Sequence, residues 1–363
     1  MMPQRQTDKL KISVVMATYN RADILPVTID HLARQTLAPA SYEVIIVDDG
    51  STDGTQQVVE QKSQQAPFRL TYLHHTNRGP GYTQNRGIRE AQAPLVLLMA
   101  DDIFLSAHGL QAHLDCHAQH PAEEAAVLGQ VVQSPELEQS VFLRHWNPFR
   151  FSDFDGCEEL PYYMFWACNI SFKKAFMTAH GMFRDRMGPA GPAAHEDAEL
   201  GCRLHQHGLR IYYDKEAVGY HHHVETLEGT IRRSYQRGQN WREFYGQVHQ
   251  PELAIRYRTY NLGFLIRQFR SLTGPRAKYL VGKDKSVASL IYRYLMRLLV
   301  FNRLTVPYLW QPLLRHAEHS RFTARFMHDR YYRGVIVYYF LQGCRDESRL
   351  GTRPQPLCGS TAA

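Results

Sequence analysis

The first hundred residues alternate short apolar runs with segments of helical spacing, and this alternation limits the choice of fold more than any other feature. Apolar runs around 12–16, 42–48, 68–75 and 94–99 are typical of strands, and most of their residues are uncharged. The segments 24–32, 55–65 and 81–92 between them place apolar residues at helical intervals. Strands that alternate with helices predict a parallel sheet with helices on both faces.

Two of these strands end in a pair of acidic residues. Asp48 and Asp49 follow the second strand, and Asp101 and Asp102 follow the fourth. Ligands of such sheets bind beyond the carboxyl ends of the strands, so the two pairs are expected in one crevice. Converging carboxylates repel unless a cation or a hydrogen-bonding group lies between them, which indicates a divalent metal or a nucleotide base. For the first pair the alternative is a helix-capping turn, because the following residues Gly50 to Thr55 are rich in cap formers.

Length and cysteine usage narrow the class of protein. The chain has 363 residues, enough for one large domain or for one domain with an appendage. Its sequence has no apolar run long enough to span a bilayer, and residues 1–10 lack the apolar core of a secretory signal. The six cysteines are scattered without a CxxC pair. We therefore expect reduced thiols in a cytoplasmic protein.

Charge divides the chain unevenly. The net charge is +7, but residues 251–363 carry 19 Lys and Arg against 6 Asp and Glu, and residues 1–250 carry 23 against 29. The basic part contains an amphipathic helical pattern with Arg293, Arg297 and Arg303. This predicts an anionic partner, for which the inner face of the cytoplasmic membrane is one candidate. The alternative is a helical appendage packed on the rest of the protein; with no nucleic-acid motif in the chain, nucleic acid is not expected.

Six motifs occur in an order that resembles glycosyltransferase family 2, whose members are inverting enzymes with a GT-A fold. The resemblance covers about residues 10–225 and rests on VVMATYNR, EVIIVDDGSTDGT, NRGPGYTQNRGI, LLMADDI, WACNISFKK and HEDAELGCRL. It implies an α/β fold with a mostly parallel central sheet flanked by helices. We expect residues 1–225 to form this catalytic domain, and residues 226–363 to form a helical, basic C-terminal region.

The resemblance implies that the nucleotide binds at the ends of the first two strands. Asp49 would accept a hydrogen bond from the ring N–H of the base, usually uracil, which a carboxylate does well. The turn residues that would complete this pocket are Ala17, Thr18 and Tyr19, with Tyr19 stacking on the base.

Two further segments are expected to contact the donor. Arg78, Gly79 and Gly81 precede a helix, whose first backbone N–H groups favour phosphate. By resemblance, Trp166 and Asn169 in the WACN segment would flank the donor sugar and the acceptor. For Trp166 a buried core position is an equally valid reading.

The segment MADDI resembles the metal-binding signature of the family. Asp102 would hold Mg²⁺ or Mn²⁺ at the diphosphate, and Asp101 would contact the ribose or a metal-bound water. Many relatives carry an acid where Ala100 stands, which leaves the ribose contact open. His221 best matches the histidine that often completes the metal site, and His223 is the alternate on the same strand face. Both histidines could instead be ordinary surface groups.

The segment HEDAEL resembles the catalytic-base motif. Asp197 would remove the proton of the acceptor hydroxyl, and Glu196 would orient or tune it. Acids in the first turn of a helix, stabilised by the helix dipole, are the structural alternative.

Together these features predict an inverting, metal-dependent glycosyltransferase. It would move a sugar from a nucleotide-diphosphate donor, expected to be UDP-linked, to a hydroxyl of a glycan or lipid-linked acceptor, as in polysaccharide synthesis for the cell envelope. A nucleotidyltransferase is disfavoured because no glycine-rich loop with a lysine follows the first strand. A nucleotide- or glycan-binding scaffold without catalysis is the remaining alternative, favoured by Ala100 and opposed by the intact HED.

Overall fold

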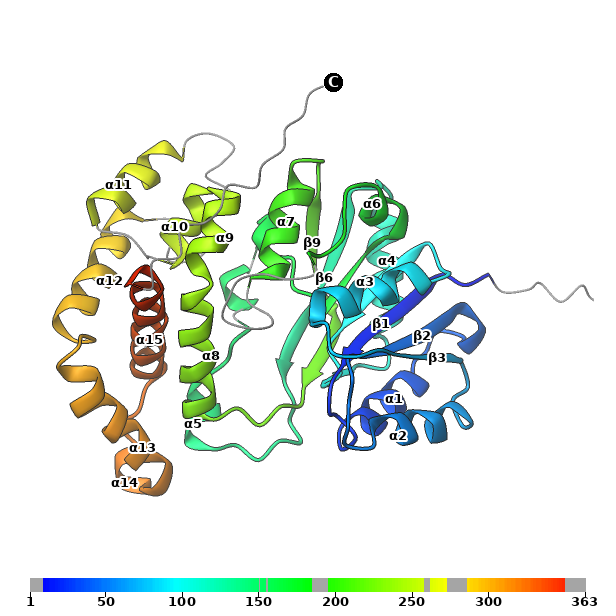
Figure 1. Ribbon diagram of the computed structural model, residues 1–363, viewed down its shortest axis with the longest axis horizontal. Coiled ribbons are helices and arrows are strands. Elements are labelled where there is room, and N and C mark those ends of the chain that lie inside the picture. Colours follow the sequence, from blue (N-terminus) through cyan, green and yellow to red (C-terminus); the bar gives the residue numbers. More distant parts are fainter. Residues whose placement is uncertain are drawn as a thin grey trace, which may run out of the picture.

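The computed structural model describes residues 9–149, 151–154, 156–184, 195–257, 262–272 and 286–349. They form a curled mixed sheet with helices on both sides and a group of C-terminal helices against one end (Figure 1). The strand order is β3-β2-β1-β4-β8-β6-β9-β5, with β7 paired to β9. This confirms the predicted fold class.

The N-terminal half of the sheet is parallel. Its strands are β1 (Ile12–Thr18), β2 (Tyr42–Asp48), β3 (Arg69–His74) and β4 (Leu95–Met99). Almost every residue of β1, β2 and β4 is buried, which explains their unbroken apolar runs. The helices α1 (Leu25–Ala33) and α2 (Thr55–Ser63) lie on one side of these strands and α3 (Pro80–Glu90) on the other (Figure 1). All four carboxyl ends therefore point to the same edge.

The second half of the sheet is mixed. Its strands are β5 (Ile103–Leu105), β6 (Ala125–Gln133), β7 (Glu159–Leu160), β8 (Asn169–Lys173) and β9 (Arg210–His221). Strand β8 runs antiparallel to both β4 and β6, whereas β9 runs parallel to β6. Strand β9 is one long strand, and its pairing with β6 shifts register between Gly129 and Val131.

Three helices belong to this half of the sheet. They are α4 (Gly109–Gln119), α6 (Lys174–Ala179) and α7 (Glu196–His205), and a short helix α5 (Val141–His145) follows β6. Helix α7 begins directly at the HED motif. It ends before Gly208, whose φ of +96° suits a glycine at a helix terminus.

The C-terminal region is helical, as expected. It contains α8 (Leu227–Gln239), α9 (Trp241–Val248), α10 (Pro251–Tyr257), α11 (Leu262–Ser271), α12 (Val287–Leu299), the π-helix η6 (Val306–Trp310), α13 (Gln311–His319), α14 (Arg321–Ala324) and α15 (Asp329–Arg349). None of the described helices is both long enough and apolar enough to cross a bilayer.

These helices pack on the sheet domain rather than standing apart from it. Trp241, Phe244 and Phe340 belong to the same apolar core as the central strands. Gly238 and Gly343 allow helices α8 and α15 to approach closely, because neither has a side chain. A Cβ at Gly238 would overlap the carbonyl oxygen of Phe340, and a Cβ at Gly343 would overlap that of Tyr235. The helical region thus forms a continuous body with the sheet, although the domain boundary near residue 225 stays a prediction.

Candidate active site

The acidic pair after β2 serves two different local purposes. Asp48 is fully buried, and its carboxylate accepts hydrogen bonds from the Ser51 N–H at 2.7 Å and the Tyr72 hydroxyl at 2.6 Å. Asp49 accepts the backbone N–H of Arg78 at 2.7 Å and that of Gly79 at 3.0 Å. Asp48 therefore stabilises the turn from 48 to 51 without capping a helix, and Asp49 fixes the loop between β3 and α3.

These hydrogen bonds change the expected role of the β3–α3 loop. The N–H groups of Arg78 and Gly79 are directed at Asp49, so the proposed use of these two amides to bind a phosphate is not what the geometry favours. The Arg78 guanidinium lies 3.8 Å from the centre of the Tyr82 ring. Each carboxylate oxygen has two lone pairs, so Asp49 can still accept another hydrogen bond from a base.

The turn after β1 lies beside this loop. The Asp49 N–H donates to the Thr18 carbonyl at 2.9 Å, which joins the ends of β1 and β2. Ala17 is half-buried, and the Tyr19 side chain is 50% exposed at the edge of the sheet. An exposed ring on a fixed turn can stack on a planar ligand without first leaving the core.

Thr18 links this turn to the second acidic pair. Its hydroxyl donates to Asp101 Oδ2 at 2.7 Å, while the Thr28 hydroxyl donates to the Asp101 carbonyl at 2.6 Å. Burial, together with the charge of Asp102, raises the pKa of Asp101 to about 6. Both acidic strand ends thus lie side by side, as the sequence predicted.

Arg21 neutralises the second pair and was not assigned a role from the sequence. Its guanidinium reaches Asp101 Oδ1 at 3.5 Å and Asp102 Oδ2 at 3.3 Å. A cation between two nearly buried carboxylates offsets their repulsion, and it lowers the pKa of Asp101 against the effect of burial. The signal was present, since Arg21 ends the VVMATYNR motif, but its partners lie about 80 residues away in the chain.

Asp102 also faces the end of β9. His221 Nε2 lies 3.8 Å from Asp102 Oδ1, and His223 Nδ1 lies 3.6 Å from Oδ2. Burial lowers the pKa of His221, which favours the neutral imidazole that binds metals. His222 points elsewhere and its ring stacks on Phe104.

Oxygen and imidazole donors of this kind suit Mn²⁺ or Mg²⁺. Among the described residues no three His, Cys, Asp or Glu side chains are already close enough to share one ion. Asp102 with either histidine therefore supplies a partial set, which fits a metal that takes its remaining ligands from the diphosphate and water.

Asp197 stands in the first turn of α7 with its two oxygens in different environments. The Ala167 N–H donates to Oδ2 at 3.1 Å, whereas Oδ1 is buried and has no hydrogen-bond partner among the residues the structure describes. Burial, together with the charge of neighbouring Glu196, raises the pKa of Asp197 to about 8, and burial also raises the pKa of Glu196. One oxygen held and the other free is an arrangement suited to a general base.

The C-terminal helices hold the start of α7, which the sequence did not reveal. His195 has a left-handed backbone with φ of +72°, and its ring stacks on Phe244 with centroids 4.7 Å apart. His195 Nε2 lies 3.0 Å from the carbonyl oxygen of Arg237 in α8. The charge of Arg237 lowers the pKa of Asp197 against the larger effect of burial.

The WACN segment lies between the two acidic centres. The Ala100 N–H donates to the Cys168 carbonyl at 3.2 Å, and the thiol pKa of Cys168 is raised by burial, with smaller contributions from Asp197 and Asp102. This segment therefore carries the predicted base to within electrostatic range of the predicted metal ligand.

The two WACN side chains expected to contact ligands differ in placement. Trp166 is half-buried and packs edge-on against Phe149 and Phe151, so part of its ring remains open. Asn169 is fully buried, and its amide nitrogen donates to the Ala217 carbonyl at 2.9 Å while its oxygen lies 3.1 Å from His113 Nε2. Asn169 thus ties β8 to its neighbours from within the core, and this placement does not favour the expected contact with the donor.

Comparison with protein families identifies the domain. The model of glycosyl transferase family 2 matches residues 13–178, which contain both acidic strand ends and the WACN segment. Residues 13–178 therefore form a glycosyltransferase family 2 domain.

Relatives of this family 2 protein extend the match toward the C-terminal side. Validoxylamine A glucosyltransferase of Streptomyces hygroscopicus subsp. limoneus is 32% identical over 249 residues, covering 61% of this chain and 53% of the relative. The poly(ribitol-phosphate) beta-N-acetylglucosaminyltransferase TarS of Staphylococcus aureus is 27% identical over 133 residues, 37% of this chain and 23% of that one. The chain thus spans about half the length of the glucosyltransferase and 23% of the length of TarS.

A solved structure shows the same fold. The mannosyltransferase PcManGT from Pyrobaculum calidifontis, solved in complex with GDP-Man and Mn²⁺, superposes with a TM-score of 0.57 at 17% identity. The superposition covers 94% of this chain and 88% of the mannosyltransferase. The fold of this family 2 protein is therefore GT-A.

A pocket opens beside the two histidines of this family 2 site. This shallow pocket is lined by residues that include His221, His223, Glu225, Gln133 and Trp146. The indole Nε1 of Trp146 is buried without a hydrogen-bond partner among the described residues. An unsatisfied buried N–H is costly, and a hydrogen bond from a ligand oxygen that reached it would offset this cost.

Proposed function

We propose that this protein transfers a sugar from a nucleotide-diphosphate donor to an acceptor hydroxyl, with inversion at the anomeric carbon. The observation that carries the proposal is Asp197, whose Oδ2 is held by Ala167 and whose Oδ1 has no partner among the described residues. An in-line displacement at the anomeric carbon needs one base on the face opposite the leaving group. A fixed carboxylate with a free oxygen meets this need.

The chain's own residues divide the work of the reaction. Asp49 and Tyr19 bind the base of the nucleotide, Thr18 orients Asp101, and Asp197 takes the proton of the acceptor hydroxyl. Burial, and to a smaller extent the charge of Glu196, keep the pKa of Asp197 high, which brings it closer to the pKa suited to a general base. The attacking oxygen forms the new glycosidic bond as the bond to the diphosphate breaks.

A divalent ion is proposed as the cofactor of this reaction, and Mg²⁺ or Mn²⁺ fits the donors. Asp102 with His221, or with His223 as the alternate, would hold the ion. When bound, such an ion stabilises the negative charge of the departing diphosphate. Mn²⁺ in the complex of the similar mannosyltransferase supports this assignment.

The donor is proposed to be UDP-linked. Asp49 can accept from the imide N–H of uracil, and guanine offers a ring N–H of the same kind. The names of the relatives support a glucosyl or N-acetylglucosaminyl group, and the similar mannosyltransferase structure holds GDP-Man.

The acceptor is proposed to be a glycan or a lipid-linked sugar bound in the pocket that Trp146 lines. Its hydroxyls would meet the indole N–H, the Gln133 amide and the Glu225 carboxylate. We also propose that the protein lies peripherally on an anionic membrane surface. The poly(ribitol-phosphate) in the name of a relative supports a cell-envelope polymer as the acceptor.

The test is a thermal-shift screen with UDP-glucose, UDP-N-acetylglucosamine and GDP-mannose, each with and without Mn²⁺, followed by an assay for slow donor hydrolysis. A true donor binds the native protein and not the unfolded chain, so it should raise Tm. The rise should be larger when the ion is present. Hydrolysis that is lost in Asp197→Asn while donor binding persists would support the enzyme assignment. Binding without hydrolysis or transfer to any acceptor would favour a non-catalytic scaffold.

A further inference from the structure

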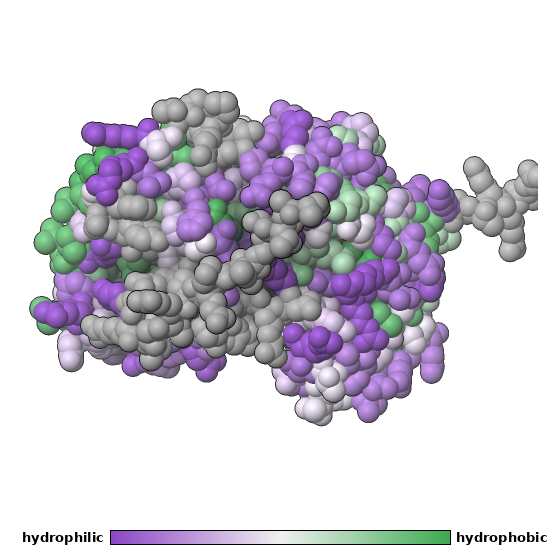
Figure 2. Space-filling model, turned by 45° about the horizontal axis from the view of Figure 1, so that its top comes forward, coloured by the Kyte–Doolittle hydropathy of each residue, from purple (hydrophilic) through white to green (hydrophobic). Residues whose placement is uncertain are grey.

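Large apolar side chains gather on one outer face of the C-terminal helices. Of the twelve large hydrophobic residues that are exposed in the described part of the chain, nine lie between positions 292 and 326. We call these nine residues the apolar face: Tyr292, Leu295, Leu298, Leu299, Leu304, Tyr308, Leu309, Phe322 and Phe326. Figure 2 shows hydrophobic atoms along the left edge, where Figure 1 places α12.

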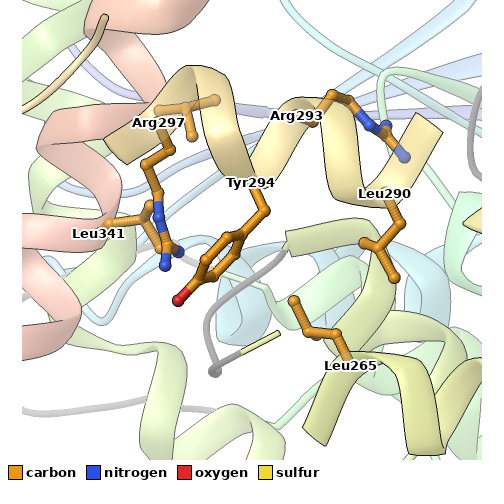
Figure 3. A pocket seen from close by; sticks show the side chains of 7 residues that line it. Leu265, Leu290, Arg293, Tyr294, Arg297 and Leu341 are labelled. Carbon is orange, nitrogen blue, oxygen red and sulfur yellow. The ribbon is translucent and has the colours of Figure 1, made fainter. Parts of the chain in front are cut away.

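Helix α12 is turned so that its arginines face inward. Figure 3 shows Arg293, Tyr294 and Arg297 around a pocket that they share with Leu265, Leu290 and Leu341. The Arg297 guanidinium lies 4.5 Å from the centre of the Tyr294 ring, and burial lowers its pKa.

The opposite side of the same helix carries the apolar residues. Tyr292 is 57% exposed and Leu299 is 71% exposed, although an amphipathic helix in water normally turns its apolar stripe to the core. Scattered exposed leucines need no explanation, but a concentrated set on an inverted helix marks an interaction surface.

The charges around this face select the kind of partner. Residues 286–328 contain six arginines and a single acid, Glu318, which is half-buried. Arg303, Arg321 and Arg325 are exposed beside the apolar residues. A second copy of this chain would bring two basic surfaces together, whereas an anionic surface would satisfy both the arginines and the apolar side chains.

The geometry points to docking of this face on an anionic lipid surface, with the apolar face entering the boundary between headgroups and acyl chains. Tyr292 and Tyr308 have the ring and hydroxyl suited to that boundary, and the exposed arginines would meet lipid phosphates. This inference identifies the surface that would contact the membrane in the proposed function, yet it does not depend on sugar transfer.

Co-sedimentation with vesicles tests the inference on the full chain. Vesicles of phosphatidylcholine with phosphatidylglycerol should carry the protein down, and vesicles of phosphatidylcholine alone should carry down much less. The variant Leu299→Glu with Leu304→Glu should reduce binding by at least about tenfold, because two well-exposed leucines no longer enter the lipid. The variant Arg303→Gln with Arg321→Gln should reduce only the preference for anionic vesicles.

The control is Val27→Glu, which places one carboxylate on an exposed apolar residue of α1 in the sheet domain and should leave vesicle binding unchanged. Donor-dependent thermal shifts report on the sugar site and separate its failure from that of the lipid face. Equal recovery of the wild type and the leucine variant with anionic vesicles would overturn the inference. A dimer in sedimentation equilibrium that Leu299→Glu with Leu304→Glu converts to monomer would also overturn it, in favour of self-association.

Discussion

The backbone N–H of Ala167 donates to Asp197 Oδ2 at 3.1 Å and so joins the WACN segment to the first turn of α7. The hydrogen bond fixes one oxygen of a carboxylate whose other oxygen is buried without a partner among the described residues. Two family 2 motifs that lie 30 residues apart therefore act as one unit around a single acid.

Replacing that acid should stabilise the folded protein while removing transfer. The pKa of Asp197 is about 8 in the folded protein and 3.8 in its unperturbed state, so between these values the folded form binds a proton that the unfolded form has released. The contribution of Asp197 to stability therefore falls as pH rises through this window.

We expect Asp197→Asn to raise Tm, by a margin over wild type that grows from pH 5 to about pH 8. Transfer should fall by about 10²-fold or more, the usual contribution of a general base. Differential scanning fluorimetry across pH measures the first effect. Asp115→Asn on the exposed surface of α4 is the control, and a margin of Tm that does not change with pH would contradict the raised pKa.

The pH profile of transfer should report the same group. Because the base works only when ionised, kcat/KM should rise with pH and level off above about 8. Arg237 lowers the pKa of Asp197, so Arg237→Gln should move this rise to higher pH by roughly half a unit, since an exposed charge is screened. Arg232→Gln on the same helix should leave the profile in place.

Removing Arg21 should make the protein more dependent on a divalent ion. Without the guanidinium, Asp101 and Asp102 repel each other and the pKa of Asp101 rises further, so Arg21→Gln should lower Tm in the absence of metal. Added Mn²⁺ should then raise Tm by more in Arg21→Gln than in wild type. Arg34→Gln, an exposed change at the residue that follows α1, is the control. Equal Mn²⁺ shifts in all three proteins would argue against a metal at these carboxylates.

The pocket beside the histidines should recognise the acceptor through Trp146. Trp146→Phe keeps an aromatic ring but loses the indole N–H, so KM for the acceptor should rise about fivefold, the value of one hydrogen bond. Donor hydrolysis and donor binding should stay unchanged. Trp310→Phe is the matched change, because that indole already donates to Val300 at 2.8 Å outside the pocket; a change in kcat or donor binding with Trp146→Phe would refute the acceptor role.

The parallel half of the fold could be predicted because its information is local. Unbroken apolar runs fix β1, β2 and β4, and acids at two strand ends place the crevice. The irregular half was less predictable, since β8 pairs antiparallel with both β4 and β6 and no local pattern encodes that choice.

The candidate site was predicted in its carboxylates but not in its supports. Asp49, Asp101 and Asp197 stand in motifs, whereas the groups that hold them are the backbone N–H of Gly79, the ion-paired guanidinium of Arg21 and the backbone N–H of Ala167. Backbone donors leave no trace in residue type, and an arginine in a motif does not show which distant carboxylates its guanidinium contacts. For the same reason the amides of Arg78 and Gly79 were assigned to a phosphate when they donate to Asp49.

The packing of His195 against Phe244 has a consequence for any shortened form of the protein. A fragment that stops near residue 225 would keep every motif of the family but would lose the aromatic wall on which the histidine before Glu196 rests. The first turn of α7 would then have no support on that side, and the acid would lose its defined position. The basic helices thus share the core of the sheet domain and support the turn that carries the proposed base.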